Sequence, residues 1–214
     1  MPSPRILFGF LGRFALLYGL LIIPWPGFNA AYARFFRGLG DLTFAHESGK
    51  RLVRFEPVPA ELHHVLGTRI VLANRDQIDR NGNGLVKYLE LDTRGVGWVP
   101  TALLVALVLA SPVSLRRRCW ALLWGLGAVH GFVLLSVAVY IWNNSAELHL
   151  LALGPIGNWI VAGLTETLTA QLGASFLVPV LIWALATLRW QDFGPGPAGR
   201  VAAPAPGVGK GNGS

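Results

Sequence analysis

The stretch RRRCWALLWGLGAVHGFVLLSVAVYIW, residues 116–142, determines the class of this protein. Three arginines precede an apolar run from Trp120 to Trp142 that contains no Asp, Glu, Lys or Arg. An α-helix needs about 20 mainly apolar residues to cross a bilayer, and this run is long enough. Tryptophan at both ends is typical of membrane interfaces, and clustered arginines are typical of a cytoplasmic flank. We therefore expect a membrane-spanning helix with Arg116–Arg118 inside the cell.

Three other apolar runs, at residues 6–23, 98–115 and 172–188, extend this interpretation to the rest of the chain. The composition agrees, since 53% of the 214 residues are hydrophobic and only 14% are charged, against about 25% charged residues in soluble domains. The predicted fold class is an integral membrane α-helical protein with about four transmembrane helices. A small extracytoplasmic β-rich (α+β) domain is inserted between helices 1 and 2.

The expected domain boundaries follow from these runs. They are residues 1–27 for the first membrane helix, 28–97 for an amphipathic helix and the β-rich domain, 98–190 for three further membrane helices with an outer loop at 143–158, and 191–214 for a disordered Gly/Pro/Ala tail. Alternation from the cytoplasmic arginines predicts a multi-pass protein of the bacterial inner membrane with both termini in the cytoplasm and residues 28–97 outside.

The first apolar run has a second interpretation. The small residues in Ala31-Tyr32-Ala33 have the form of a signal-peptidase cleavage site, and Arg5 would be the charged region before the apolar segment. The run is long, contains Arg13 and ends well before that site, which favours a retained helix. The intact mass of the purified protein decides between the two interpretations.

The sharpest motif runs from Asp79 to Glu90 and reads DRNGNGLVKYLE. It fits the calcium-loop pattern D-x-[DN]-x-[DN]-G-x5-E, in which the ligands would come from Asp79, Asn81, Asn83, Leu85 and Glu90. The flanking segments are rich in strand-forming residues rather than helical, so a plain hairpin with an Asn-Gly turn is the favoured interpretation. Weak calcium binding stays open as the alternative, and no other cofactor is expected.

No catalytic constellation is recognisable, so the chain is predicted to be a non-enzymatic accessory subunit. The alternatives are a calcium-responsive envelope protein and a membrane-embedded enzyme of thiol type. Such an enzyme would use Cys119, the chain's one cysteine, or else Arg94 or His130. For Cys119, which follows three arginines, a small interfacial residue is the simpler interpretation.

The net charge of +7 does not indicate nucleic-acid binding here, because basic residues gather at the cytoplasmic flanks of membrane segments. The expected partners are membrane lipids and another membrane protein, with no nucleic acid.

Three short stretches give a more specific indication. They are Pro24-Trp25-Pro26-Gly27, Asp92-Thr93-Arg94-Gly95, and Ala110-Ser111-Pro112-Val113 followed by the arginine triplet. Together they resemble the small accessory membrane proteins that accompany bacterial exosortases, of the exosortase H-associated kind. The resemblance covers roughly residues 11–127 and leaves out the calcium-like loop. It implies an auxiliary role in sorting and surface anchoring of exported proteins, with no catalytic residues to carry over.

Overall fold

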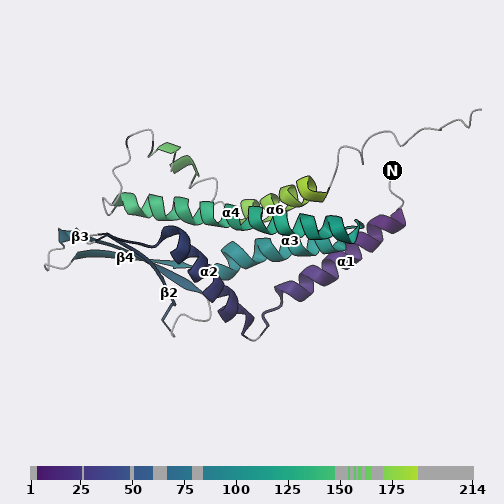
Figure 1. Cartoon of the computed structure of the whole chain (residues 1–214), viewed down its shortest axis with the longest axis horizontal. Helices are drawn as coiled ribbons and strands as arrows, with labels where there is room; N and C mark the ends of the chain where they lie inside the picture. The colour runs from purple at the N-terminus through teal and green to yellow at the C-terminus, as the bar shows by residue number, and fades with distance from the viewer. Residues whose placement is uncertain are drawn as a thin grey trace, which may run out of the picture.

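The computed structural model describes residues 4–25, 27–48, 51–59, 67–78, 84–147 and 171–187, together with positions 154, 157, 159, 160 and 162–164. The elements are α1 (Pro4–Ile22), α2 (Phe28–Phe44), β1 (His46–Ser48), β2 (Arg51–Glu56), β3 (Thr68–Ile78), β4 (Gly84–Leu91), η2 (Arg94–Trp98), α3 (Val99–Ala110), α4 (Leu115–Glu147) and α6 (Gln171–Thr187). Figure 1 shows an elongated molecule with a sheet at one end and a group of helices at the other. The predicted tail, 191–214, lies outside the described residues.

The sheet has four antiparallel strands in the order β1-β2-β3-β4, of which β1 is only three residues long. Val53 of β2 pairs with Leu72 of β3, and Leu72 in turn pairs with Lys87 of β4. Ile70 and Leu72 in the central strand are completely buried. β-Branched and aromatic residues favour this extended, half-buried conformation. The strands therefore form where the sequence favours them, on both sides of the Asn-Gly sequence at 81–84.

Helix α2 joins the sheet to the helices. Its Gly40 lies against the ring of Phe55 in β2, so close that an added Cβ would sit 2.6 Å from that ring. Beside this contact, Asp41 Oδ1 accepts a hydrogen bond of 3.1 Å from the Phe55 amide. Phe36 of α2 is buried in the same core as the sheet residues. These contacts fix the position of α2 on β2.

Helix α3 is the centre of the helical part. It contacts α1, α4 and α6, and most of its side chains are buried, with Leu104 and Val108 completely inaccessible. Gly125 of α4 permits a close approach, because a Cβ there would lie 2.9 Å from Leu104. At the end of α3 the Ser111 hydroxyl accepts a 2.8 Å hydrogen bond from the indole of Trp183 in α6. The helices thus pack tightly around α3.

The prediction of about four transmembrane helices is wrong. Within the part of the chain that the structure describes, one helix, Leu115–Ser145, is long and apolar enough to cross a membrane. The other apolar helices, Leu7–Ile22, Arg94–Ala110 and Phe176–Thr187, have 10–17 residues each. At 1.5 Å per residue, a helix of 17 residues is only about 25 Å long, against about 30 Å for the hydrocarbon core.

The physical reason lies in the ends of these helices. The predicted run 98–115 contains Pro112, and a proline disfavours helical backbone in the residue before it. Ser111 is accordingly extended, and α3 ends at Ala110. Conversely, α4 begins at Leu115 and continues through residues 143–145, so it includes both the arginine triplet and the start of the expected outer loop. Hydropathy alone therefore assigned residues 98–115 to one membrane helix, although α3 ends at Ala110 and α4 begins at Leu115.

The C-terminal end of α1 is closed by side chains rather than by a glycine cap. The helix contains no N–H group that can donate to its last carbonyls. The indole of Trp25 donates to the Leu20 carbonyl and that of Trp98 donates to the Leu21 carbonyl, both at 3.0 Å. The guanidinium of Arg94 donates to the Ile22 carbonyl. Two of these donors come from the segment that precedes α3, so they bind α1 to it.

Candidate functional site

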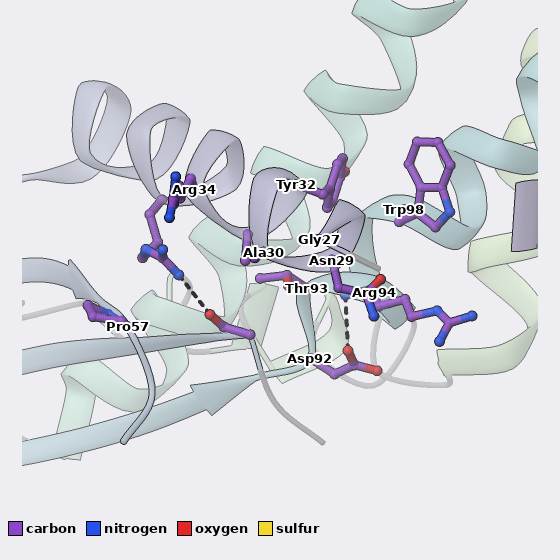
Figure 2. A pocket seen from close by; sticks show the side chains of 13 residues that line it. Gly27, Asn29, Ala30, Tyr32, Arg34, Pro57, Asp92, Thr93, Arg94 and Trp98 are labelled. Atoms are coloured by element: carbon purple, nitrogen blue, oxygen red, sulfur yellow. Dashed lines mark hydrogen bonds between the residues drawn. The ribbon is translucent and has the colours of Figure 1, made fainter. Parts of the chain in front are cut away.

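A cleft with a volume of about 510 Å³ lies between α2, the chain before β3 and the segment that joins β4 to α3. Its lining includes three arginines, Arg34, Arg37 and Arg94, and one acidic residue, Asp92. A volume of this size is within the usual range for small-molecule sites. Figure 2 shows Arg34 and Arg94 on either side of Thr93, with Asp92 below. We take this cleft as the candidate functional site.

One face of α2 forms the first wall. Ala30, Ala33, Arg34 and Arg37 line the cleft from this helix, and residues three and four apart lie on the same helical face. The two alanines leave room that longer side chains would fill. The Arg37 guanidinium donates a 2.9 Å hydrogen bond to the Gly67 carbonyl across the cleft. The two alanines therefore leave this wall of the cleft open, and the two arginines give it a positive charge.

The N-terminus of α2 also opens onto the cleft. Gly27 precedes the helix with φ 76°, a left-handed conformation that glycine adopts without strain. Asn29 and Ala30, in the first turn, line the cleft. No side chain among the described residues caps this end. The Phe28 amide donates to the Trp25 carbonyl at 3.1 Å, and the helix dipole makes this end of α2 favourable for negative charge.

The second wall is built by residues 92–98. They include η2, a wider π-helical turn, a conformation that is frequent at functional sites. Asp92 Oδ1 accepts a 3.0 Å hydrogen bond from the Arg94 amide, which fixes the turn. Thr93 is buried against Gly67, where an added Cβ would overlap the Thr93 hydroxyl. This close approach holds the two walls together at the base of the cleft.

The cleft carries an excess of positive charge. None of its three arginines forms an ion pair with a carboxylate of the described residues, where the ion pairs are Arg54–Glu56 and Arg69–Glu90. Burial, followed by the neighbouring Arg34, lowers the pKa of Arg37, while Asp41 opposes this shift. Like charges held together in this way favour the arrival of an anion.

Tyr32 lies at the inner side of the cleft, next to the aromatic ring of Trp98 at a centroid distance of 5.5 Å. Burial raises the pKa of Tyr32 to about 12, and the nearby Thr101 hydroxyl partly offsets this rise. The Tyr32 hydroxyl has no hydrogen bond of normal geometry within the described residues. A Cβ on Gly97 would lie 2.5 Å from that hydroxyl, so the glycine makes space for the tyrosine.

The predicted calcium ligands fall only partly within the described residues. Asp79, Asn81 and Asn83 lie outside them, whereas Leu85 and Glu90 are in β4. The Glu90 carboxylate pairs with Arg69 at 3.1 Å. β3 ends just before the motif and β4 includes its second half, whereas a typical calcium hand has a helix on each side of the loop. Calcium binding stays a prediction.

The residues considered for a thiol enzyme are spread over the molecule. Cys119 and His130 lie on α4, eleven positions apart, which is about 16 Å along the helix axis. His130 Nδ1 is 2.9 Å from the Leu126 carbonyl, which can only accept, so this nitrogen carries a proton. Arg94 bonds to the end of α1. Among the described residues, the structure therefore does not bring Cys119, His130 and Arg94 together.

Sequence reasoning missed the cleft as a site. Its arginines come from two segments about 60 positions apart, and their proximity depends on how α2 packs on the sheet. One local signal was present, because Ala30, Ala33, Arg34 and Arg37 share a helical face that mixes small and cationic residues. That face is neither an apolar core face nor a uniformly solvated one.

Comparison with known proteins adds no relative: no family model, no curated protein and no solved structure matches this chain.

Proposed function

We propose that this chain is a non-enzymatic accessory protein that is anchored in the bacterial cytoplasmic membrane and binds another membrane protein. The observation that carries the proposal is the outward-facing apolar surface of α4. Trp120, Leu123 and Trp124 are 53%, 65% and 70% exposed on a helix long enough to cross a bilayer. Contiguous apolar surface of this kind indicates a membrane or a protein interface.

The proposed orientation rests on the positions of the charges and of the sheet. The arginine triplet is at the beginning of α4, and the sheet lies beside the other end of that helix (Figure 1). Because arginines favour the cytoplasmic side, the sheet would lie on the outer side of the membrane. Exposed apolar side chains on α1 and α6, such as Leu16 and Leu185, would then contact lipid or the partner.

The resemblance to exosortase-associated proteins suggests the kind of partner, a membrane-embedded system that sorts exported proteins. A tagged full-length chain, purified in mild detergent, should retain such a protein from the same cells. Leu135→Arg should reduce the retention of the chain in the membrane after alkaline extraction, because Leu135 is 49% exposed and lies toward the middle of the apolar run, where a lipid-facing arginine costs about 2.5–3.5 kcal/mol. Val86→Arg, on the exposed face of β4, is the matched control. Repeated purification of the chain alone would contradict the proposed partnership.

The chain's one cysteine permits a direct test of orientation. Cys119 is exposed next to the arginine triplet, and it should react in intact cells with a membrane-permeant maleimide but not with an impermeant one. In the Cys119→Ser background, Val86→Cys should react with the impermeant reagent as well. The opposite labelling pattern would overturn the orientation. A fully active Cys119→Ser protein in a complementation assay would also exclude the thiol-enzyme alternative.

A further inference from the structure

The function proposed above gives the arginine cleft no role, because it depends on the apolar surface of the helices. The cleft is therefore available to bind a separate ligand. Its cations are not neutralised by carboxylates of the described residues, and the Asp92 carboxylate already accepts from the Arg94 amide. The uncapped N-terminus of α2 adds a positive end at the same place. Two cationic side chains and a helix end that converge on one space match an anion that carries several oxygens.

The position of the cleft indicates where that anion comes from. Trp98 lines the cleft, and Trp25 and Phe28 lie next to it, with Phe28 stacked edge-on to Trp98 at 4.4 Å between centroids. Trp25 is 51% exposed. Exposed aromatic rings of this kind gather at the headgroup level of membranes. The cleft also lies at the end of the apolar helix α1, because Trp98, which lines the cleft, donates to the Leu21 carbonyl of that helix.

We propose that this cleft binds the phosphate headgroup of a membrane phospholipid, with Arg34 and Arg37 as the hydrogen-bond donors. Guanidinium groups match phosphate oxygens by paired hydrogen bonds. Ala30 and Ala33 leave room for the glycerol part of the headgroup beside the helix. Arg94 contributes charge from the second wall while it holds the end of α1. The proposal rests on the membrane placement proposed above, but its test does not require a known orientation.

The experiment uses the full-length protein in a neutral detergent, titrated with phosphatidylglycerol and followed by native mass spectrometry. Arg34→Gln should weaken lipid binding at least tenfold. The Arg34 side chain is exposed, so the substitution should leave the melting temperature without lipid unchanged. Arg54→Gln removes the same charge from the exposed surface of β2 and is the matched control. Equal losses in the two variants would show attraction by net charge alone and would overturn the site.

A second variant tests whether binding depends on the shape of the cleft as well as on its charge. Ala30→Leu fills the cleft without changing any charge and keeps a good helix former, so it should also weaken binding at least tenfold. Unchanged binding in Ala30→Leu would overturn the proposal. Glycerol 3-phosphate and inorganic phosphate are titrated in parallel to distinguish lipid from a free anion. If only these soluble anions raise the melting temperature, and the lipid does not, the lipid assignment is wrong.

Discussion

Replacement of Gly67 by alanine tests the contact that holds the two walls of the cleft together. The new Cβ would overlap the Thr93 hydroxyl and lie 3.1 Å from Thr93 Cβ, and Thr93 is only 4% exposed, so it has little room to move. Overpacking of a tight contact costs about 1–3 kcal/mol. For a chain of this size, that corresponds to a fall in melting temperature of roughly 2–12 °C. Tryptophan fluorescence during thermal unfolding in detergent measures it.

A double-mutant cycle shows whether the overlap is the cause. Thr93→Ala removes the hydroxyl and the methyl group, so Gly67→Ala should cost far less in that background than in the wild type. Gly38→Ala is the matched control, because nothing lies within 4 Å of the added methyl group. It should stabilise the helix by about 0.5–1 kcal/mol. The reasoning is refuted if Gly67→Ala leaves the melting temperature unchanged, or if Thr93→Ala gives no relief.

Three further predictions concern the core, the pH dependence and calcium. Leu104→Ala should lower the free energy of unfolding by about 2–5 kcal/mol, because Leu104 is completely buried where α3 meets α4, and chemical denaturation measures this loss. Tyr32, with a pKa of about 12 in the fold and 10.0 in the ordinary phenol, should contribute stability that is complete below pH 10.0 and is lost as the pH rises toward 12. The free energy of unfolding should therefore differ less between about pH 9 and about pH 11 in Tyr32→Phe than in the wild type. The calcium hypothesis predicts a higher melting temperature at millimolar calcium that Asp79→Asn abolishes, and an unchanged wild-type melting temperature would remove it.

Local signals in the sequence were sufficient for the elements with strong boundaries. Gly27 precedes α2, and this helix, Phe28–Phe44, is the amphipathic helix expected within residues 28–97. Strand-forming residues on both sides of the Asn-Gly sequence at 81–84 correspond to β3 and β4. In each case neighbouring residues determine the backbone, so no long-range information is needed.

The sequence was a poor guide where the outcome depends on tertiary packing. Hydropathy did not indicate that α3 stops before Pro112, and it therefore overestimated the number of helices that can cross a membrane. The cleft depends on Gly67 meeting Thr93 and on α2 lying across β2. These contacts join positions far apart in the chain, and nothing in the local pattern of either partner specifies the other.

The closure of α1 by Trp98 and Arg94 has a consequence for the order of assembly. These donors lie more than 70 positions after the carbonyls that they serve, at Leu21 and Ile22. During synthesis, the end of the first helix therefore stays incomplete until the ribosome has released the whole sheet segment and η2. In a nascent chain arrested before residue 94, the end of α1 should lack these two hydrogen bonds and pack weakly. In a chain that extends past α3, both hydrogen bonds should be formed. The end of α1 therefore gains its last hydrogen bonds only after the sheet domain has left the ribosome.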